Sequence, residues 1–269
     1  MTTQEIRLRR QYGQKLKDSD ITRPEQVVEY LGAMQAQEYA MAKWAIALRM
    51  KNAVTDTDIE KAFNDGDILR THLLRPTWHF VARDDIRWML DIAAPRVIAN
   101  NGSMYRKYGL DDKVFSKCFK VMEKMLRDNN YTTRDAIRAE LAKMNIEGDS
   151  IFMSGIMMQA ELTGLICSGP RRGNQFTYAL IGERAPKAKM LNREEALREL
   201  CLCYFTTRGP ASVKDFTTWS GLTVKDAKEG VNLIADAVVK ETIDGADYYF
   251  SPDVPSGRKE VSFLMPDYD

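Results

Sequence analysis

Hydrophobic residues along the chain change from helical to strand spacing in the same order three times. The third copy shows this order most plainly. A helix over residues 193–205 ends before Gly209-Pro210, and two further helices are separated by Gly221. The spacing then changes to two residues, in two strands joined at Asp244-Gly245, a dipeptide typical of tight hairpins. Three helices followed by a hairpin predict a winged helix-turn-helix unit.

The second copy has the same order. Its predicted elements are helices over 112–128, from 133 onward and over 151–162, and strands over 165–168 and 175–180. The two strands flank a basic loop that contains Arg171 and Arg172. We expect this loop to be a wing that reaches DNA.

The first copy is more altered. Its predicted elements are helices over 24–34, 40–50 and 57–64, and strands over 68–74 and 77–82. The strands are joined at Arg75-Pro76. This segment is again interpreted as a winged helix. For the chain as a whole, the alternative to three winged helices is an irregular helical protein with two or three hairpins.

The fold class that follows is mainly α with small β-hairpins (α+β), built from tandem winged helix-turn-helix units. We expect four divisions. They are 1–110, the first winged helix with an N-terminal and a linking helix; 111–190, the second; 191–255, the third; and 256–269, the start of a C-terminal β-rich region that this chain does not continue.

Composition narrows the possible settings. The chain is 44% hydrophobic and 29% charged, and no apolar run approaches the ~20 residues that span a bilayer. We therefore expect a cytoplasmic, nucleoid-associated protein with no membrane partner and four reduced cysteines. Only two histidines are present, which argues against a zinc site, and we expect no metal and no cofactor.

Net charge constrains the nucleic-acid surface. A formal charge of +1 is far from strongly basic, so any basic surface has to arise by local segregation. Besides the loop at Arg171 and Arg172, basic residues gather near the N-terminus. They are Arg7, Arg9, Arg10, Lys15 and Lys17. This second group has a simple alternative, a solvated helix face.

Two glutamines lie where the second helix is expected to end. On a continuous helix, Gln35 and Gln37 would point in opposed directions. They can reach one site only if the chain leaves helical geometry here, as it would at a junction between helices. Two surface glutamines without a function are the common alternative.

Both histidines fall in the hairpin of the first unit. Strand alternation places Thr77, His79 and Val81 on one face and the aromatic pair Trp78 and Phe80 on the other. We expect the aromatic pair to pack inward and His79 to face a groove. A half-buried strand histidine satisfied by backbone is the alternative.

Several segments together resemble the AlkZ-like family of bacterial DNA glycosylases, over nearly the whole chain and in the family's order. They are Gln35-Ala36-Gln37, Trp44, Leu48-Arg49, Arg70-Thr71-His72, Arg75-Pro76-Thr77-Trp78-His79, Arg208-Gly209-Pro210-Ala211, Asp215-Phe216, Trp219-Ser220-Gly221-Leu222 and Leu264-Met265-Pro266-Asp267-Tyr268-Asp269. Members are monofunctional enzymes that remove alkylated purines and unhook interstrand crosslinks. The resemblance implies that Gln35 and Gln37 are catalytic. Some relatives have aspartate at the second position.

The chemistry available to glutamine limits the substrate. A carboxamide does not titrate, but its oxygen can orient a water and stabilise a developing sugar cation. This suffices when the leaving group departs easily, as an N7- or N3-alkylated purine does, because it is already cationic and leaves as a neutral base. Glu38 is adjacent and carries a carboxylate. The motif contains no lysine, so we expect no Schiff-base lyase activity.

The resulting hypothesis is a monomeric DNA glycosylase that binds double-stranded DNA. We expect the DNA or lesion to contact His72, Arg75, Thr77, His79, Arg171 and Arg172. A non-catalytic winged-helix DNA-binding protein, such as a transcriptional regulator, is the alternative. A protein-interaction scaffold is a third class, because the fold serves all three.

Overall fold

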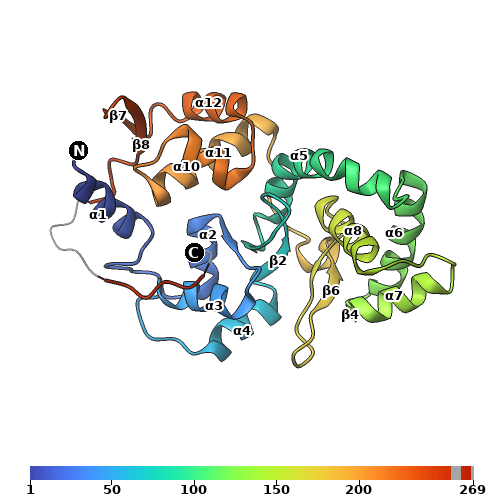
Figure 1. Ribbon diagram of the computed structural model, residues 1–269. Helices are drawn as coiled ribbons and strands as arrows, with labels where there is room; N and C mark the ends of the chain where they lie inside the picture. The colour runs from blue at the N-terminus through green and yellow to red at the C-terminus, as the bar shows by residue number, and fades with distance from the viewer. Residues whose placement is uncertain (256–261, 268–269) are drawn as a thin grey trace.

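The computed structural model describes residues 1–255 and 262–267, and its helices and short antiparallel sheets confirm the mixed α+β class (Figure 1). The first unit contains α1 (Thr3–Gly13), α2 (Pro24–Leu31), β1 (Ala33–Gln35), α3 (Tyr39–Ala47), α4 (Asp56–Asp65), β2 (Ile68–His72) and β3 (Trp78–Ala82). The long helix α5 (Ile86–Lys107) leads from its sheet to the second unit.

The other two units keep the predicted order of helices followed by a hairpin. The second has α6 (Asp112–Leu126), β4 (Thr132–Thr133), α7 (Arg134–Ala142), α8 (Ser150–Leu162), β5 (Ile166–Ser168), β6 (Thr177–Leu180) and the single turn α9 (Ile181–Arg184). The third has α10 (Arg193–Arg208), α11 (Val213–Ser220), α12 (Val224–Leu233), β7 (Val239–Ile243) and β8 (Ala246–Phe250).

Local capping fixes where several helices begin. The side chains of Thr55, Ser212 and Thr223 each accept a hydrogen bond from the backbone N–H three residues on. The aspartate at that position in turn accepts a bond from the backbone N–H of the cap residue. These reciprocal pairs satisfy backbone groups that a helix start leaves unpaired. The predicted cap at Thr223 is thereby confirmed.

One prediction about the first unit is wrong. The helix expected over 24–34 ends at Leu31, because Gly32 adopts a left-handed φ of 74°. The next three residues form β1, which pairs antiparallel with β3, so that the sheet has the order β1-β3-β2. The chain therefore leaves helical geometry before Gln35 through a strand, not through a direct helix-helix junction.

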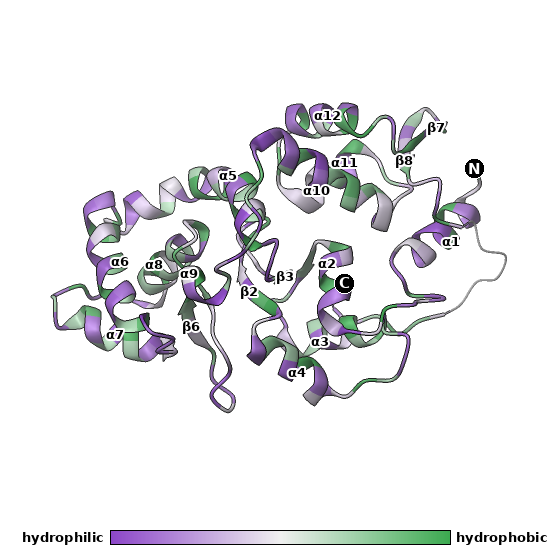
Figure 2. Cartoon of the chain, turned by 180° about the vertical axis from the view of Figure 1, so that it is seen from behind, coloured by the Kyte–Doolittle hydropathy of each residue, from purple (hydrophilic) through white to green (hydrophobic). Residues whose placement is uncertain are grey.

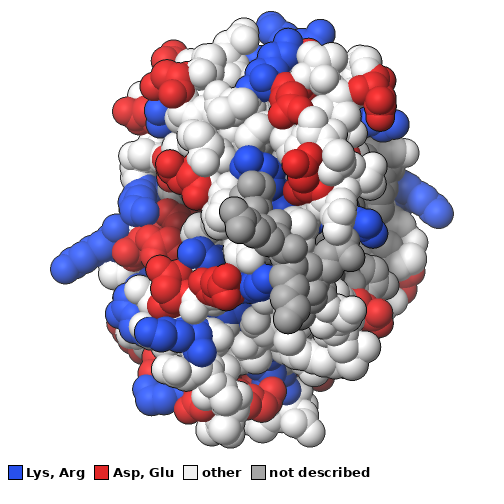
Figure 3. All heavy atoms as spheres, turned by 90° about the vertical axis from the view of Figure 1, so that its left-hand side faces the viewer, with Lys and Arg blue, Asp and Glu red and all other residues white. Residues whose placement is uncertain are grey.

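Charged side chains of both signs are distributed over the face that carries α1 (Figure 3). The basic residues near the N-terminus do not form one free cluster there. Arg9 donates to the Val254 carbonyl, Arg10 donates to the Pro210 carbonyl, and Lys15 pairs with Asp20. Across the described ranges, every helix is too short or too polar to cross a membrane.

Hydrophilic and hydrophobic residues alternate along most of the helices (Figure 2), and the buried hydrophobic residues form several clusters. The second unit has its own cluster, around Cys118, Met122 and Ile156, and a separate cluster joins α2, α3 and α4. The remaining large cluster combines the β2–β3 hairpin and the start of α5 with α10, α11 and α12. This core joins the third unit to the first. The proposed division of the chain at residue 190 stays a prediction.

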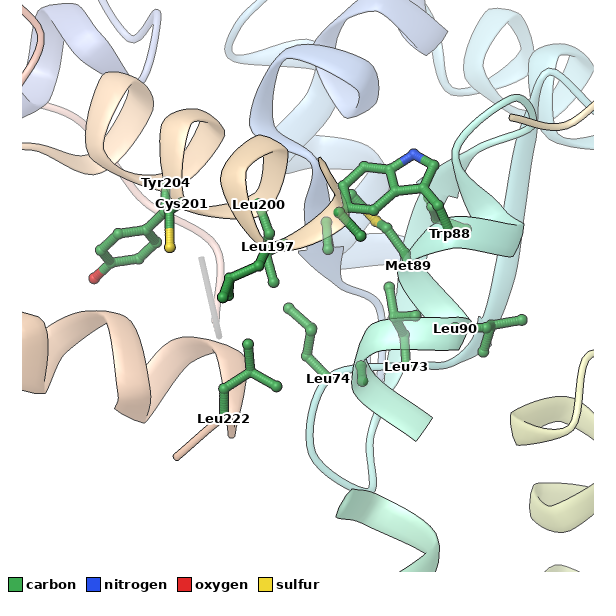
Figure 4. Close-up of a cluster of buried hydrophobic side chains, with 14 of the residues drawn as sticks. Leu73, Leu74, Trp88, Met89, Leu90, Leu197, Leu200, Cys201, Tyr204 and Leu222 are labelled. Carbon is green, nitrogen blue, oxygen red and sulfur yellow. The ribbon is translucent and has the colours of Figure 1, made fainter. Parts of the chain in front are cut away.

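Side chains from far apart in sequence face each other in that shared core (Figure 4). Leu73 and Leu74 from the hairpin lie opposite Leu197, Leu200 and Leu222 from the third unit. Burying each large aliphatic side chain stabilises the fold by about 1.5–3 kcal/mol. The relative position of the first and third units is therefore set by core packing.

We expect Gly230→Ala to lower the free energy of unfolding by about 1–3 kcal/mol, the usual cost of overpacking. A Cβ at Gly230 of α12 would lie 2.2 Å from the Cys201 Sγ and 3.3 Å from Leu197 of α10. Urea unfolding measures the change. The matched control is Gly182→Ala in α9, where a Cβ meets no atom of the described residues within 4 Å and stability should stay equal or rise slightly. Equal midpoints for both variants would contradict the tight α10–α12 contact.

Candidate active site

A pocket of about 440 Å³ opens between the first and third units, a volume in the range of small-molecule sites. Its floor comes from α2, β1, α3 and β3, and its facing wall comes from α10 and α11 (Figure 1). The residues that line it are Arg10, Gln14, Leu31, Ala33, Met34, Gln35, Ala42, Ala45, Arg49, Arg75, His79, Tyr204, Arg208, Ala211, Lys214, Asp215, Thr218, Trp219 and Asp267.

Gln35 reaches the pocket from the last position of β1. Strand pairing sets it directly opposite His79 of β3, and His79 is in turn opposite Thr71 of β2. Cross-strand partners lie on the same face of a sheet with Cβ atoms about 4.5–5.5 Å apart. A hydrogen bond of 3.2 Å from an Arg75 Nη2 to the Gln35 Oε1 holds the carboxamide.

His79 is buried but still lines the pocket. Its Nδ1 lies 3.0 Å from the Thr77 carbonyl oxygen. A carbonyl can only accept, so Nδ1 carries the proton and Nε2 of the neutral ring carries a lone pair. Burial lowers the pKa of His79 to about 3, with smaller lowering contributions from Arg75, His72 and Arg208. At neutral pH this residue is thus an uncharged hydrogen-bond acceptor.

The opposite wall is an aromatic and cationic stack. Trp219 lies 5.0 Å from Tyr204 between ring centroids, and the Arg208 guanidinium lies 4.6 Å from the Trp219 centroid. Arg208 also donates from Nη1 to the Leu31 carbonyl at 2.9 Å and from Nη2 to the Ala33 carbonyl at 3.0 Å. These bonds tie the wall to the floor on both sides of Gly32.

The pocket is electropositive. Five cationic side chains line it, from Arg10, Arg49, Arg75, Arg208 and Lys214, against the two carboxylates of Asp215 and Asp267. Ser212 holds the Asp215 carboxylate through its backbone N–H and its hydroxyl, both at 2.8 Å. A low-dielectric cleft with an excess of one sign of charge concentrates oppositely charged ligands, which here would be anions. No group of metal-ligating side chains occurs within the described ranges.

The structure does not bring both glutamines into the pocket lining. Gln35 is half-buried there, whereas Gln37 and Glu38 are exposed at the bend between β1 and α3. The Thr77 hydroxyl lies 3.3 Å from the Leu74 carbonyl within the hairpin. Trp78 of β3 is half-buried and the other four residues of this strand are buried, and His79 lines the pocket.

The second histidine lies away from the pocket. His72 is buried, its backbone N–H donates to Glu161 of α8 at 2.9 Å, and its Nδ1 contacts the same carboxylate. Its ring packs on Trp78 at 4.3 Å. The Arg70 guanidinium covers the Trp78 ring at 4.4 Å. This group joins the first unit's sheet to the second unit.

The two basic residues of the predicted wing behave differently. Arg172 is exposed, with a hydrogen bond to the Tyr131 carbonyl at 3.0 Å. Arg171 folds back onto the first unit, where its guanidinium lies 4.8 Å from the Tyr39 ring and 4.4 Å from the Phe176 ring. Its side chain is only 14% exposed, so the wing at this residue packs against protein.

The sequence alone assigns no site role to the residues of α10 and α11 that form the facing wall. Arg208 and Trp219 belong to segments that carry the family resemblance, but nothing in their spacing places them beside Gln35, about 170 residues earlier. Arg10 was visible only as part of a basic helix. These residues meet in space because the first and third units share a core.

Comparisons with known proteins agree with the fold. A family model described as DNA glycosylase AlkZ-like matches residues 28–269. An interstrand DNA cross-link repair glycosylase of Streptomyces sahachiroi is 26% identical over 204 residues, 73% of this chain and 54% of that protein. The chain thus spans about half the length of this curated relative. The solved structure of the Streptomyces sahachiroi DNA glycosylase AlkZ matches with a TM-score of 0.78 at 19% identity, over 94% of this chain and 70% of that one.

The buried neutral His79 predicts a pH dependence of stability. Its pKa of about 3 in the folded state lies below the ordinary 6.5, so the unfolded chain binds this proton more readily. We therefore expect this residue to lower the free energy of unfolding by up to about 1.4 kcal/mol per pH unit as the pH falls from about 6.5 toward 3. His79→Asn, which keeps a donor for Thr77, should flatten the slope measured by urea unfolding. Parallel slopes would contradict a neutral His79.

Proposed function

Because the chain belongs to the AlkZ-like DNA glycosylase family, we propose that it hydrolyses the N-glycosidic bond of alkylated purines in double-stranded DNA. The observation that carries this proposal is Gln35 beside a neutral His79 at the floor of a cationic pocket. Both floor groups can orient a water, and neither supplies a proton to a leaving base at neutral pH.

The substrate class follows from that lack of acid. An N7- or N3-alkylated purine carries a positive charge before reaction. When the bond from C1′ to the base nitrogen breaks, its electron pair leaves with the base and neutralises that charge. The base needs no proton from the protein, so a floor of carboxamide and neutral imidazole is sufficient for this substrate.

The floor also offers acceptors for the attacking water. The His79 Nε2 lone pair and the second lone pair of the Gln35 carbonyl oxygen can each accept a water hydrogen. The water oxygen then forms the new bond to C1′, and its proton is released to solvent. The Gln35 dipole stabilises the sugar cation as it develops. Gln37 is assigned a catalytic role by the family resemblance, acting from the exposed bend next to this floor.

The wall suits an extruded base. Enzymes that act on a base within a duplex rotate it into a pocket and stack it against aromatic or apolar side chains. Trp219 lines the pocket and is backed by Tyr204 and Arg208. We propose that Trp219 stacks on the lesion base while the cationic side chains bind the flanking phosphates.

Crosslinked purines are a second substrate within this class. The Streptomyces sahachiroi relative is an interstrand DNA cross-link repair glycosylase by name. A purine joined to the opposite strand through N7 has the same cationic, labile glycosidic bond as a simple N7-alkylpurine. Release of one such base would unhook the strands by the same steps.

Base release tests the proposal directly. The protein should excise N7-methylguanine from a duplex, and Gln35→Ala should reduce the single-turnover rate by about 10²–10³-fold, the usual loss for one preorganised polar group. Binding to the same duplex should change little. The matched control is Gln159→Ala on α8, away from the pocket. If the wild type releases no base from N7-methylguanine or a nitrogen-mustard crosslink yet binds duplex, the protein is a non-catalytic DNA-binding protein.

Phosphate binding by the pocket has a separate signature. We expect Lys214→Ala to reduce the slope of log K against log salt by about 1 for duplex DNA, one phosphate contact fewer. Fluorescence anisotropy at several salt concentrations measures the slope. Lys113→Ala on α6, an exposed lysine of the second unit, is the control that should leave it unchanged. If the wild type, Lys214→Ala and Lys113→Ala all have the same slope, the DNA phosphates do not bind at Lys214.

A further inference from the structure

We propose that Arg75 is a positioning residue that fixes the orientation of the Gln35 carboxamide; this inference rests on the proposed function. The arginine lies in the turn between β2 and β3 and lines the same pocket. Its Nη2 donates to the Gln35 Oε1 at 3.2 Å. Gln35 and Arg75 thus meet at the floor from two different segments of the first unit.

The chemistry of the pair selects one orientation. A guanidinium has five N–H donors and no acceptor, so it can hold only the oxygen of the carboxamide. The Gln35 amide nitrogen must then point away from Arg75. Without this contact the two ends of the carboxamide could exchange by rotation. The water-binding oxygen would no longer have a fixed place.

The backbone at Arg75 shows that this turn is held in an unfavourable conformation. Arg75 has a φ of 58°, in the left-handed region that is unfavourable for a residue with a side chain. In the same turn, the Leu73 backbone N–H donates to the Thr77 carbonyl at 3.3 Å. From this turn the Arg75 side chain reaches the pocket floor.

The third unit presses on the same turn. Gly221, at the end of α11, has a φ of 72°, and a Cβ there would lie 3.3 Å from the Arg75 Cγ. The Gly221 carbonyl accepts from the Arg96 Nε of α5 at 2.8 Å. The Arg75 Nε is buried without a hydrogen-bond partner among the described residues, so packing and the Nη2 contact, rather than bonds at Nε, hold the guanidinium.

Lysine in place of Arg75 distinguishes a positioning role from a simple phosphate contact, because lysine can replace arginine in the second role but not in the first. Arg75→Lys keeps the positive charge but lacks the planar group that reaches Oε1. If Arg75 acts through Gln35, lysine should preserve DNA affinity and still lose rate. If Arg75 acts only on phosphate, lysine should preserve both.

The orientation itself is measurable without activity. In protein labelled with ¹⁵N-glutamine, the Gln35 side-chain signals are those missing from Gln35→Ala. In Arg75→Lys we expect them to move toward the positions of mobile glutamines, whereas Arg138→Lys, an exposed arginine of the second unit, should leave them in place. Unmoved Gln35 signals in Arg75→Lys would overturn the proposal, whether or not the protein is active. Moved signals in a protein that releases no base would support the positioning role and reject the glycosylase.

A double-mutant cycle of Arg75→Lys and Gln35→Ala provides a second test of the proposal. In the parent, Arg75→Lys should lower the single-turnover rate of N7-methylguanine release by about 10- to 100-fold, with duplex affinity within 3-fold, as expected for a misplaced catalytic group. In the Gln35→Ala background the same change should alter the residual rate by less than about 2-fold. Multiplicative losses in the cycle would show that Arg75 does not act through Gln35, and would also overturn the proposal.

Discussion

The candidate site depends on one clamp, the two hydrogen bonds that Arg208 donates to the Leu31 and Ala33 carbonyls. Between these carbonyls the chain turns at Gly32, where a Cβ would lie 2.8 Å from the Cys203 Sγ of α10. A helix end leaves its last carbonyls without partners inside the helix. Here an arginine from the third unit provides one partner and simultaneously fixes the first residue of β1.

Because Arg208 belongs to the third unit and bonds to the first, a movement of one unit relative to the other would displace both the floor and the wall of the pocket. The end of α2 sets the register of β1 on β3, and that register sets Gln35 opposite His79. The same α10 that carries Arg208 supplies Leu197 and Leu200 to the shared core. The pocket is thus positioned by hydrophobic packing between residues that are far apart in the sequence. Such packing provides the rigid support that a site with precisely placed polar groups needs.

The sequence predicted local structure better than the site. Helix order, the cap at Thr223 and the hairpin at Asp244-Gly245 follow from patterns within a few residues, and the structure has them. The helix predicted over 24–34 was too long. Ala33 and Met34 have helix-compatible side chains, so the local sequence does not show that the helix has already ended. Only pairing with β3 and contact with α10 reveal the break at Gly32. Arg171 likewise looked like a free wing residue, since the rings of Tyr39 and Phe176 that cover it meet only in the folded protein.

The five cationic side chains that line the pocket would repel the cationic base of the proposed substrate. In the proposed DNA complex this balance changes, since phosphates neutralise cationic groups as they dock. Before DNA arrives, the same charges have another effect: Arg75 and Arg208 both act with burial to lower the pKa of His79. The imidazole at the floor is therefore a neutral acceptor rather than a further cation. Cationic walls around a neutral floor fit the proposed reaction, in which one pocket binds the anionic backbone and still receives a positively charged base.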